Sequence, residues 1–251
     1  MLIFDFDGVL INSLDEIVLT AYNAATDSLF TSPAEVPSDL LQMFKDNRFH
    51  VQAIGDAIAL MNWCLINWRK DSQKILTREE YLTIAQGADL ALADRTNLIY
   101  AARKRFIEKD IGRWFALHQT YQPLWDELTR RKNHPVVILT NKDHDATLRL
   151  CRHFGLTIDA KDIYSGDNGV SKIENMLRIQ ERFAKEAFSF IDDSVKNLNE
   201  LDLYFNTEKK VLTLLLATWG YTGAQDSMMA QEYGYAVLQQ TDVVRLLDRG
   251  E

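Results

Sequence analysis

The 251-residue chain has little cysteine and no excess of positive charge. Its two cysteines, Cys64 and Cys151, are far apart and lie in apolar helical contexts. Their spacing matches neither a zinc site nor a disulfide framework, so we expect two packed thiols in a reducing compartment. The formal charge of -8 argues against general nucleic-acid binding, which usually requires a basic excess. These absences favour a globular protein of the cytoplasm.

Long apolar runs are also missing. The longest stretch, Val211 to Trp219, includes two threonines and is far shorter than the roughly 20 residues of a membrane-spanning helix, so we expect a buried strand there. The apolar run that begins at Met1 contains two aspartates and does not resemble a secretory signal. We therefore expect no membrane partner. There is no internal repeat and no low-complexity tract.

The first ten residues, MLIFDFDGVL, place two carboxylates inside a short run of strand-forming residues. Burying unpaired carboxylates is costly, so we expect the strand to end near Asp5 and to open into a site. Asp5 and Asp7 are two residues apart and point to the same side of an extended chain. Such a pair can hold a divalent cation or divide the duties of nucleophile and acid/base, while a solvated strand edge is the simpler alternative. Gly8 allows a sharp turn.

Short β-rich runs alternate with helical patterns in the last half of the chain. We expect strands at 135–140, 162–165, 188–191, 211–217 and 235–238, and helices at 143–154, 173–183, 195–205 and 242–247. Strands that alternate with helices predict a parallel sheet with helices on both faces. The fold class is therefore α/β, with a three-layer, Rossmann-like core.

Between the first strand and this core the apolar spacing is helical almost throughout. Ile54 and Ile58, for example, are followed at helical steps by further apolar residues. We therefore predict an all-helical domain at 14–122, inserted into a core that consists of residues 1–13 and 123–251.

Two helix starts in this insertion have capping signatures. Ser13 and Glu16 have the spacing of a capping box, in which each side chain bonds to the other residue's backbone N–H. Thr77 is expected to cap a later helix, which we place at about 79–88.

Polar residues gather where the expected strands end. Ligands bind at the carboxyl ends of the strands in an open parallel sheet. Taken singly these residues are ordinary, since a threonine at a strand end is usually a turn residue and a lysine at a helix start is usually solvated. Together they combine carboxylates, a hydroxyl and a cation at one sheet edge. They are Asp5 and Asp7, then Thr140, Asn141 and Lys142, then Lys172, and finally Asp192 and Asp193.

The order of these groups resembles the four motifs of the haloacid dehalogenase-like hydrolase superfamily. The inserted helical domain lies where the family's class 1 caps lie, and the loop at 218–221 is similar to one in phosphoglycolate phosphatase-like members. Ile173, Asn197 and Asp192 depart from commoner choices of proline, an acidic residue and glycine. The four matches are residues 5–10 (DFDGVL), Thr140 with Asn141, Lys172, and residues 191–194 (IDDS).

This resemblance implies a magnesium-dependent phosphomonoester hydrolase that acts on a small phosphorylated metabolite through an aspartyl phosphate. Asp5 is then the nucleophile and Asp7 the acid/base. The presence of Asp7 favours phosphatase over dehalogenase chemistry, because attack on carbon does not need this second carboxylate. The implied Mg²⁺ ligands are Asp5, the Asp7 carbonyl and Asp193, with Asp192 nearby, and the phosphate-binding groups are Thr140, Asn141 and Lys172.

Two other functions fit the same motifs. A phosphomutase would pass the phosphoryl group to a sugar, and a non-catalytic scaffold would use the fold only for binding. The expected state is a monomer or a homodimer. Polar residues near the loops of the helical domain are candidates for substrate contact, although such residues are more often ordinary surface residues. The candidates are Asn12, Asn47, Arg48 and His50.

Overall fold

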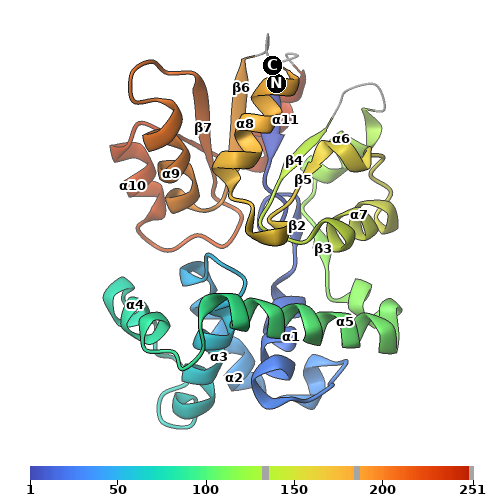
Figure 1. Cartoon of the computed structure of the whole chain (residues 1–251), viewed down its shortest axis with the longest axis vertical. Helices are drawn as coiled ribbons and strands as arrows, with labels where there is room; N and C mark the ends of the chain where they lie inside the picture. The colour runs from blue at the N-terminus through green and yellow to red at the C-terminus, as the bar shows by residue number, and fades with distance from the viewer. Residues whose placement is uncertain (132–135, 184–186, 249–251) are drawn as a thin grey trace. The chain divides into compact units, whose positions relative to one another are not determined.

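The computed structural model describes residues 1–131, 136–183 and 187–248 and divides into two compact units (Figure 1). The core unit contains Met1–Asn12 and Gln119–Glu251, and the helical unit is Ser13–His118. The limits expected from the sequence were 13 and 123. Pro135, the first residue of one expected strand, lies outside the described residues.

The core unit is built on a sheet of six parallel strands in the order β5-β4-β1-β6-β7-β8 (Figure 1). The central strand β1 pairs with both β4 and β6, so that Phe4 lies opposite Ile138 on one side and Ile191 on the other. The segments that follow these three strands therefore meet at one edge. The strands are β1 (Leu2–Phe4), β4 (Val137–Leu139), β5 (Ile163–Tyr164), β6 (Phe188–Asp192), β7 (Leu212–Ala217) and β8 (Ala236–Leu238).

Helices connect the strands and cover the sheet, which confirms the predicted α/β fold class. Helix α9 packs on β6 and β7 and contacts α8 and α10, while α6 contacts α11. Ile3, Val137, Phe190 and Leu214 lie in the apolar core beneath them. The helices are α6 (Leu124–Arg130), α7 (His144–His153), α8 (Lys172–Arg182), α9 (Val195–Phe205), α10 (Asp226–Glu232) and α11 (Gln240–Asp248).

Three elements of the core unit, β2, β3 and α10, were not predicted. Strands β2 (Ile11–Asn12) and β3 (Gln119–Thr120) form a small antiparallel sheet where the chain leaves and re-enters the core unit. Strands of two residues carry too little alternation to be recognised. Helix α10 lies between the strands expected at 211–217 and 235–238, where no helix was predicted.

The helical unit contains α-helices and short 3₁₀ turns in its described residues, as predicted. Helix α1 packs against α3 and α5, and α4 packs against α3. Its free thiol Cys64 is buried, and this burial raises the pKa of the thiol to about 12. The helices are α1 (Leu14–Thr26), α2 (Ser38–Asp46), α3 (Asp56–Asn67), α4 (Arg78–Gln86) and α5 (Leu92–Ala116).

The capping prediction is right for Thr77 and wrong for Ser13. Thr77 and Glu80 form a reciprocal capping box at the start of α4. Ser13 makes no side-chain capping bond. The reason is that the expected partner, Glu16, is buried and accepts hydrogen bonds from Arg103 Nε at 2.8 Å and Nη2 at 3.0 Å. Across the described ranges, no helix is both long and apolar enough to cross a membrane.

Candidate active site

The turn after β1 shapes the sheet edge. The Asp5 amide donates to the Ile191 carbonyl at 2.8 Å and so continues the pairing with β6. Gly8 then turns the chain with φ +87°, and a Cβ at this position would lie 2.0 Å from Asp193 Oδ2. Only glycine satisfies both the positive φ and this close approach, which explains the residue that follows the two aspartates.

Three carboxylates converge at this edge. Ligand oxygens of Asp5, Asp192 and Asp193 lie within 4.8 Å of one another, and all three residues are buried. Lys172 brings an ammonium group to this cluster, and its Nζ lies 3.1 Å from Asp5 Oδ1 and 2.5 Å from Asp192 Oδ2. Three carboxylates that converge in this way attract a cation.

The pKa shifts reflect this convergence of carboxylates. Burial raises the pKa of Asp5 well above its usual value; Lys172 opposes this effect, and the Asp192 and Asp193 carboxylates add to it. Burial alone would lower the pKa of Lys172, but Asp192 and Asp5 outweigh it and raise that pKa. Lys172 therefore stays charged, whereas it offsets only part of the effect of burial on Asp5.

The Asp192 carboxylate accepts several hydrogen bonds from neighbouring protein groups. In addition to Lys172, it accepts hydrogen bonds from the Ser194 amide at 2.8 Å and from Asn197 Nδ2 at 3.1 and 3.3 Å. Asn197, which stands where relatives often have an acid, thus adds donors to this carboxylate. With its oxygens so engaged, Asp192 orients Lys172 more readily than it offers an oxygen to a metal.

Asp193 is held by the loop after β7. Its Oδ2 accepts a hydrogen bond from the Tyr221 amide at 2.5 Å. A Cβ on Gly220 would lie 2.4 Å from the Cβ of Asp193 and 2.4 Å from the Gly8 carbonyl oxygen, so a larger residue does not fit there. Trp219 Nε1 donates to the Val9 carbonyl at 2.9 Å and ties this loop to the turn after β1.

The end of β4 carries the second motif. Thr140 is buried, and its Oγ1 accepts a hydrogen bond from the Lys142 amide at 3.1 Å, while Asn141 is exposed. Lys142 is also buried, and its Nζ lies 3.2 Å from Asp7 Oδ1 and 3.3 Å from Oδ2. From the sequence we placed Lys142 at this strand end but predicted no function for it. Its position directly after Thr140 and Asn141 could have indicated that it belongs to the site.

The sheet edge therefore gathers the core residues selected from the sequence. Ligand oxygens of the three aspartates lie within 4.8 Å of one another, and Lys172 contacts two of these residues, Asp5 and Asp192. Asp7 and Thr140 lie on the segments that follow the paired strands β1 and β4. A cation fits the donor set, since carboxylate oxygens are the ligands that Mg²⁺ prefers and three buried carboxylates converge here.

The candidate substrate contacts of the helical unit serve other purposes. Asn47 is buried, donates to the Met43 and Lys74 carbonyls at 2.9 Å, and accepts from the Leu76 amide at 2.7 Å. His50 Nε2 lies 2.8 Å from the Leu76 carbonyl oxygen. Both residues thus fix the loop before α4, which makes them poor candidates for substrate contact.

Arg48 and Asn12 also have partners within their own units. Arg48 donates to the Val51 carbonyl at 2.7 Å. In the core unit, Asn12 accepts a hydrogen bond from the Tyr221 hydroxyl at 3.3 Å. Asn12 therefore lies beside the loop that also holds Asp193.

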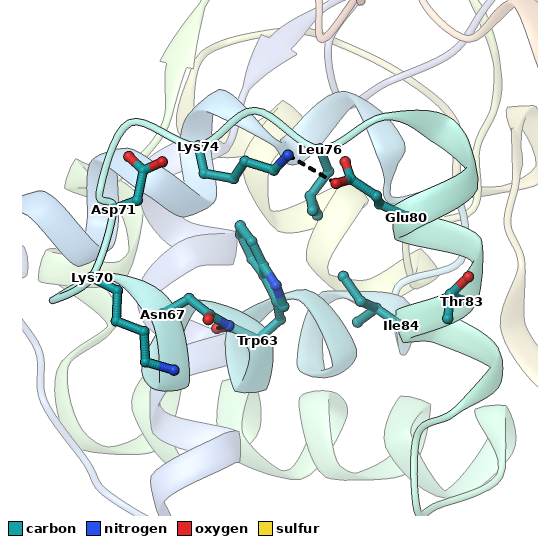
Figure 2. A pocket seen from close by; sticks show the side chains of 9 residues that line it. All are labelled: Trp63, Asn67, Lys70, Asp71, Lys74, Leu76, Glu80, Thr83 and Ile84. Atoms are coloured by element: carbon teal, nitrogen blue, oxygen red, sulfur yellow. Dashed lines mark hydrogen bonds and ion pairs between the residues drawn. The ribbon is translucent and has the colours of Figure 1, made fainter.

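The loop fixed by Asn47 and His50 forms one wall of a cavity of about 500 Å³ in the helical unit (Figure 2). Figure 2 shows the Trp63 ring between the Lys74 side chain and Ile84, with a Lys74–Glu80 ion pair of 2.8 Å along one side. The cavity contains none of the clustered aspartates. Its lining residues are Trp63, Asn67, Lys70, Asp71, Lys74, Leu76, Glu80, Thr83 and Ile84.

Residues 1–199 match the family model described as haloacid dehalogenase-like hydrolase. Because this match covers most of the chain and the four motifs, the protein belongs to the haloacid dehalogenase-like hydrolase family. No curated protein matches the sequence at a significant level.

Solved structures share the fold at low sequence identity. A predicted phosphoglycolate phosphatase from Haemophilus somnus 129PT is 15% identical, with a TM-score of 0.58 over 98% of this chain and 97% of that one. A predicted phosphatase from Clostridium acetobutylicum is 13% identical, with a TM-score of 0.59 over 99% and 97%. Protein Tyrosine Kinase A of Mycobacterium tuberculosis is 15% identical, with a TM-score of 0.51 over 89% and 85%.

Proposed function

We propose that the protein is a phosphatase that hydrolyses a small phosphomonoester through an aspartyl-phosphate intermediate. The observation that carries this proposal is the separation of two carboxylates at one strand end. Asp5 is buried beside Lys172, at 3.1 Å, whereas Asp7 is partly exposed beside a different lysine, Lys142, at 3.2 Å. Two carboxylates in different surroundings can perform different tasks.

In the first step an Asp5 carboxylate oxygen attacks phosphorus. A bond forms between this oxygen and phosphorus, the ester P–O bond breaks, and Asp7 gives its proton to the leaving oxygen. In the second step water attacks the phosphorus of the aspartyl phosphate and gives a proton to Asp7. The bond between phosphorus and the Asp5 oxygen breaks, and inorganic phosphate leaves with Asp5 restored.

Lys172, Thr140 and Asn141 are the groups that we assign to the phosphoryl oxygens. Lys172 remains charged because Asp192 and Asp5 raise its pKa. Charge-assisted hydrogen bonds from an ammonium to phosphate oxygens are strong. The Thr140 hydroxyl and the backbone near Asn141 extend the donor set from the neighbouring strand.

Asp5 and Asp193, with the main-chain carbonyl of Asp7, are the residues that would hold Mg²⁺. When bound, this ion would offset the repulsion between the carboxylates and an anionic substrate. Asp192 stays close to this site, but we assign it to positioning Lys172, because its oxygens already accept hydrogen bonds from Lys172, Ser194 and Asn197.

The family and the low-identity neighbours agree with this assignment without choosing the substrate. Neighbours of this fold are described as phosphatases, and one as a protein tyrosine kinase. The presence of Asp7 favours transfer from a phosphomonoester over dehalogenation. Water is the simplest acceptor, so hydrolysis ranks above a phosphomutase reaction.

The test is phosphate release by the purified chain with Mg²⁺ from phosphoglycolate, sugar phosphates, nucleotides and p-nitrophenyl phosphate. We expect turnover of at least one of these, and Asp5→Asn should lower kcat by at least about 10³-fold because it removes the nucleophile. Lys196→Met, on the exposed face of α9, is the matched control and should retain full activity. Turnover that survives Asp5→Asn, or none with any substrate, would reject the proposal.

A further inference from the structure

Lys142 is a buried cation that contacts Asp7. Its side chain is only 2% exposed, whereas that of Asp7 is 21% exposed. The ammonium nitrogen lies almost equally far from both carboxylate oxygens of Asp7, at 3.2 and 3.3 Å. Keeping an ammonium group away from water is costly unless a partner compensates it. Such a placement therefore points to a specific use.

The backbone around Lys142 is fixed on both sides. Its amide donates to Thr140 Oγ1 at 3.1 Å, and the Thr140 amide donates to the Tyr164 carbonyl at 2.9 Å. On the other side Asp143 caps α7 by accepting from the Ala146 amide at 2.8 Å. The lysine thus projects from a short rigid connection between β4 and α7.

Each of the two lysines of the site is paired with a carboxylate near the end of β1. Lys172 contacts Asp5 and Asp192, while Lys142 contacts Asp7. Because β1 and β4 are paired in parallel, with Phe4 opposite Ile138, the segments that follow them stay side by side. The sheet itself therefore sets the distance between Asp7 and Lys142.

We propose that Lys142 is a positioning residue that fixes the orientation of the Asp7 carboxyl group for proton transfer to and from the reacting oxygens. This inference rests on the proposed phosphatase function. An acid/base group must lie within hydrogen-bond reach of the oxygen that it protonates, and a displacement of about 1 Å can lower a rate by about 100-fold. An ammonium that contacts both oxygens restricts rotation of the carboxyl group.

The test compares Lys142→Met, which keeps the length of the side chain, with Lys142→Arg, which keeps the charge, and with the control Lys196→Met. Each is assayed with the best alkyl phosphomonoester of the panel and with p-nitrophenyl phosphate. Nitrophenolate leaves with little need for a proton, whereas an alkoxide needs one. We expect Lys142→Met to lower kcat about 100-fold for the alkyl ester and less than about 5-fold for the aryl ester, with KM nearly unchanged and partial rescue in Lys142→Arg.

The same substitution in an Asp7→Asn background shows whether Lys142 acts through Asp7. We expect no further loss with the alkyl ester, since the group to be oriented is already gone. Equal losses for both esters, or independent losses in the double variant, would overturn the proposal. Circular dichroism and thermal unfolding identify a variant that fails to fold, in which case Lys142→Arg carries the comparison.

Crystal structures of the wild type and of Lys142→Met separate this proposal from the proposed function. We expect the Asp7 side chain in one orientation in the wild type and in a different or disordered one in the variant. An unchanged Asp7 would refute positioning even if the enzyme is active. A changed Asp7 would support positioning even if phosphate release fails with every substrate.

Discussion

Both units bury charged side chains, but they balance the charges differently. In the helical unit one carboxylate, Glu16, meets one guanidinium, Arg103, through two hydrogen bonds, and Thr20 Oγ1 donates to the same carboxylate at 2.8 Å. In the core unit three aspartates converge, and the ammonium of Lys172 contacts two of them, Asp5 and Asp192. The balanced pair suits folding, whereas the unbalanced cluster, with its three converging carboxylates, has the donor set of a cation site.

The largest expected effect is on the balanced pair. Glu16→Gln leaves Arg103 buried without its carboxylate, so we expect a loss of about 3–5 kcal/mol in the free energy of unfolding. Urea denaturation followed by circular dichroism measures it. Adding Arg103→Met should recover part of the loss, because no charge then stays buried.

The matched control for this change is Glu108→Gln. Glu108 forms an exposed pair with Lys104 at 3.9 Å, so its replacement should change the unfolding free energy by less than about 0.5 kcal/mol. Similar losses for Glu16→Gln and Glu108→Gln would show that the buried pair is not special.

The second effect concerns the unbalanced cluster. Mg²⁺ at about 100 times its dissociation constant should stabilise the wild type by about 2.7 kcal/mol, and EDTA should remove this gain. In Asp193→Asn the gain should be much smaller, because a ligand is lost. Denaturation with Mg²⁺ and with EDTA measures both proteins, and Glu108→Gln should respond like the wild type. An equal response of Asp193→Asn would mean that the metal binds elsewhere.

The third effect follows from the pKa of Asp5 in the absence of metal. Burial raises this pKa in the folded state above the unfolded value of about 3.9, so the folded protein holds the proton more tightly. Stability from this group is present below the unfolded pKa and is lost as the pH rises. Asn cannot ionise, and Lys172 keeps its Asp192 partner at 2.5 Å. We therefore expect Asp5→Asn in EDTA to raise Tm by about 2–4 °C at pH 7.

Thermal unfolding at a series of pH values checks this sign. The difference in Tm between Asp5→Asn and the wild type should shrink as the pH falls toward about 4. A wild type that is more stable than Asp5→Asn at neutral pH in EDTA would contradict the inference that the ionised Asp5 carboxylate destabilises the metal-free fold.

The smallest effect concerns an exposed pair in the helical unit. A hydrogen bond from Lys74, with the Thr77 backbone, lowers the pKa of Glu80 to about 2. Because the folded pKa is below the unfolded one, the stabilisation of α4 is present above the unfolded pKa, about 4.3, and is lost as the pH falls toward 2. Amide exchange in α4 should report this loss, and Glu80→Gln should remove the pH dependence. Glu79→Gln, one residue earlier, is the matched control and should retain it.

Prediction from sequence succeeded where a local pattern carried the information. The alternation of strands and helices indicated the parallel sheet, and the Thr77 capping box follows from neighbours three residues apart. It failed where distant residues compete: the spacing of Ser13 and Glu16 fits a cap, but Arg103, 87 residues away, takes the carboxylate. Strands β2 and β3 are two residues long, which is too short for an alternation of apolar and polar residues to be recognised in the sequence.

The candidate site divides in the same way. The motif order and the βα alternation were enough to predict that Asp5, Thr140 and Asp193 lie at the strand ends. Their partners depend on the order of the strands in the sheet. Because β1 lies between β4 and β6, Lys142 contacts Asp7, and Lys172 contacts Asp5 and Asp192. Spacing along the chain determines which way a side chain points and where it lies on a strand. Charge compensation depends instead on distances between residues on neighbouring strands that are far apart in sequence.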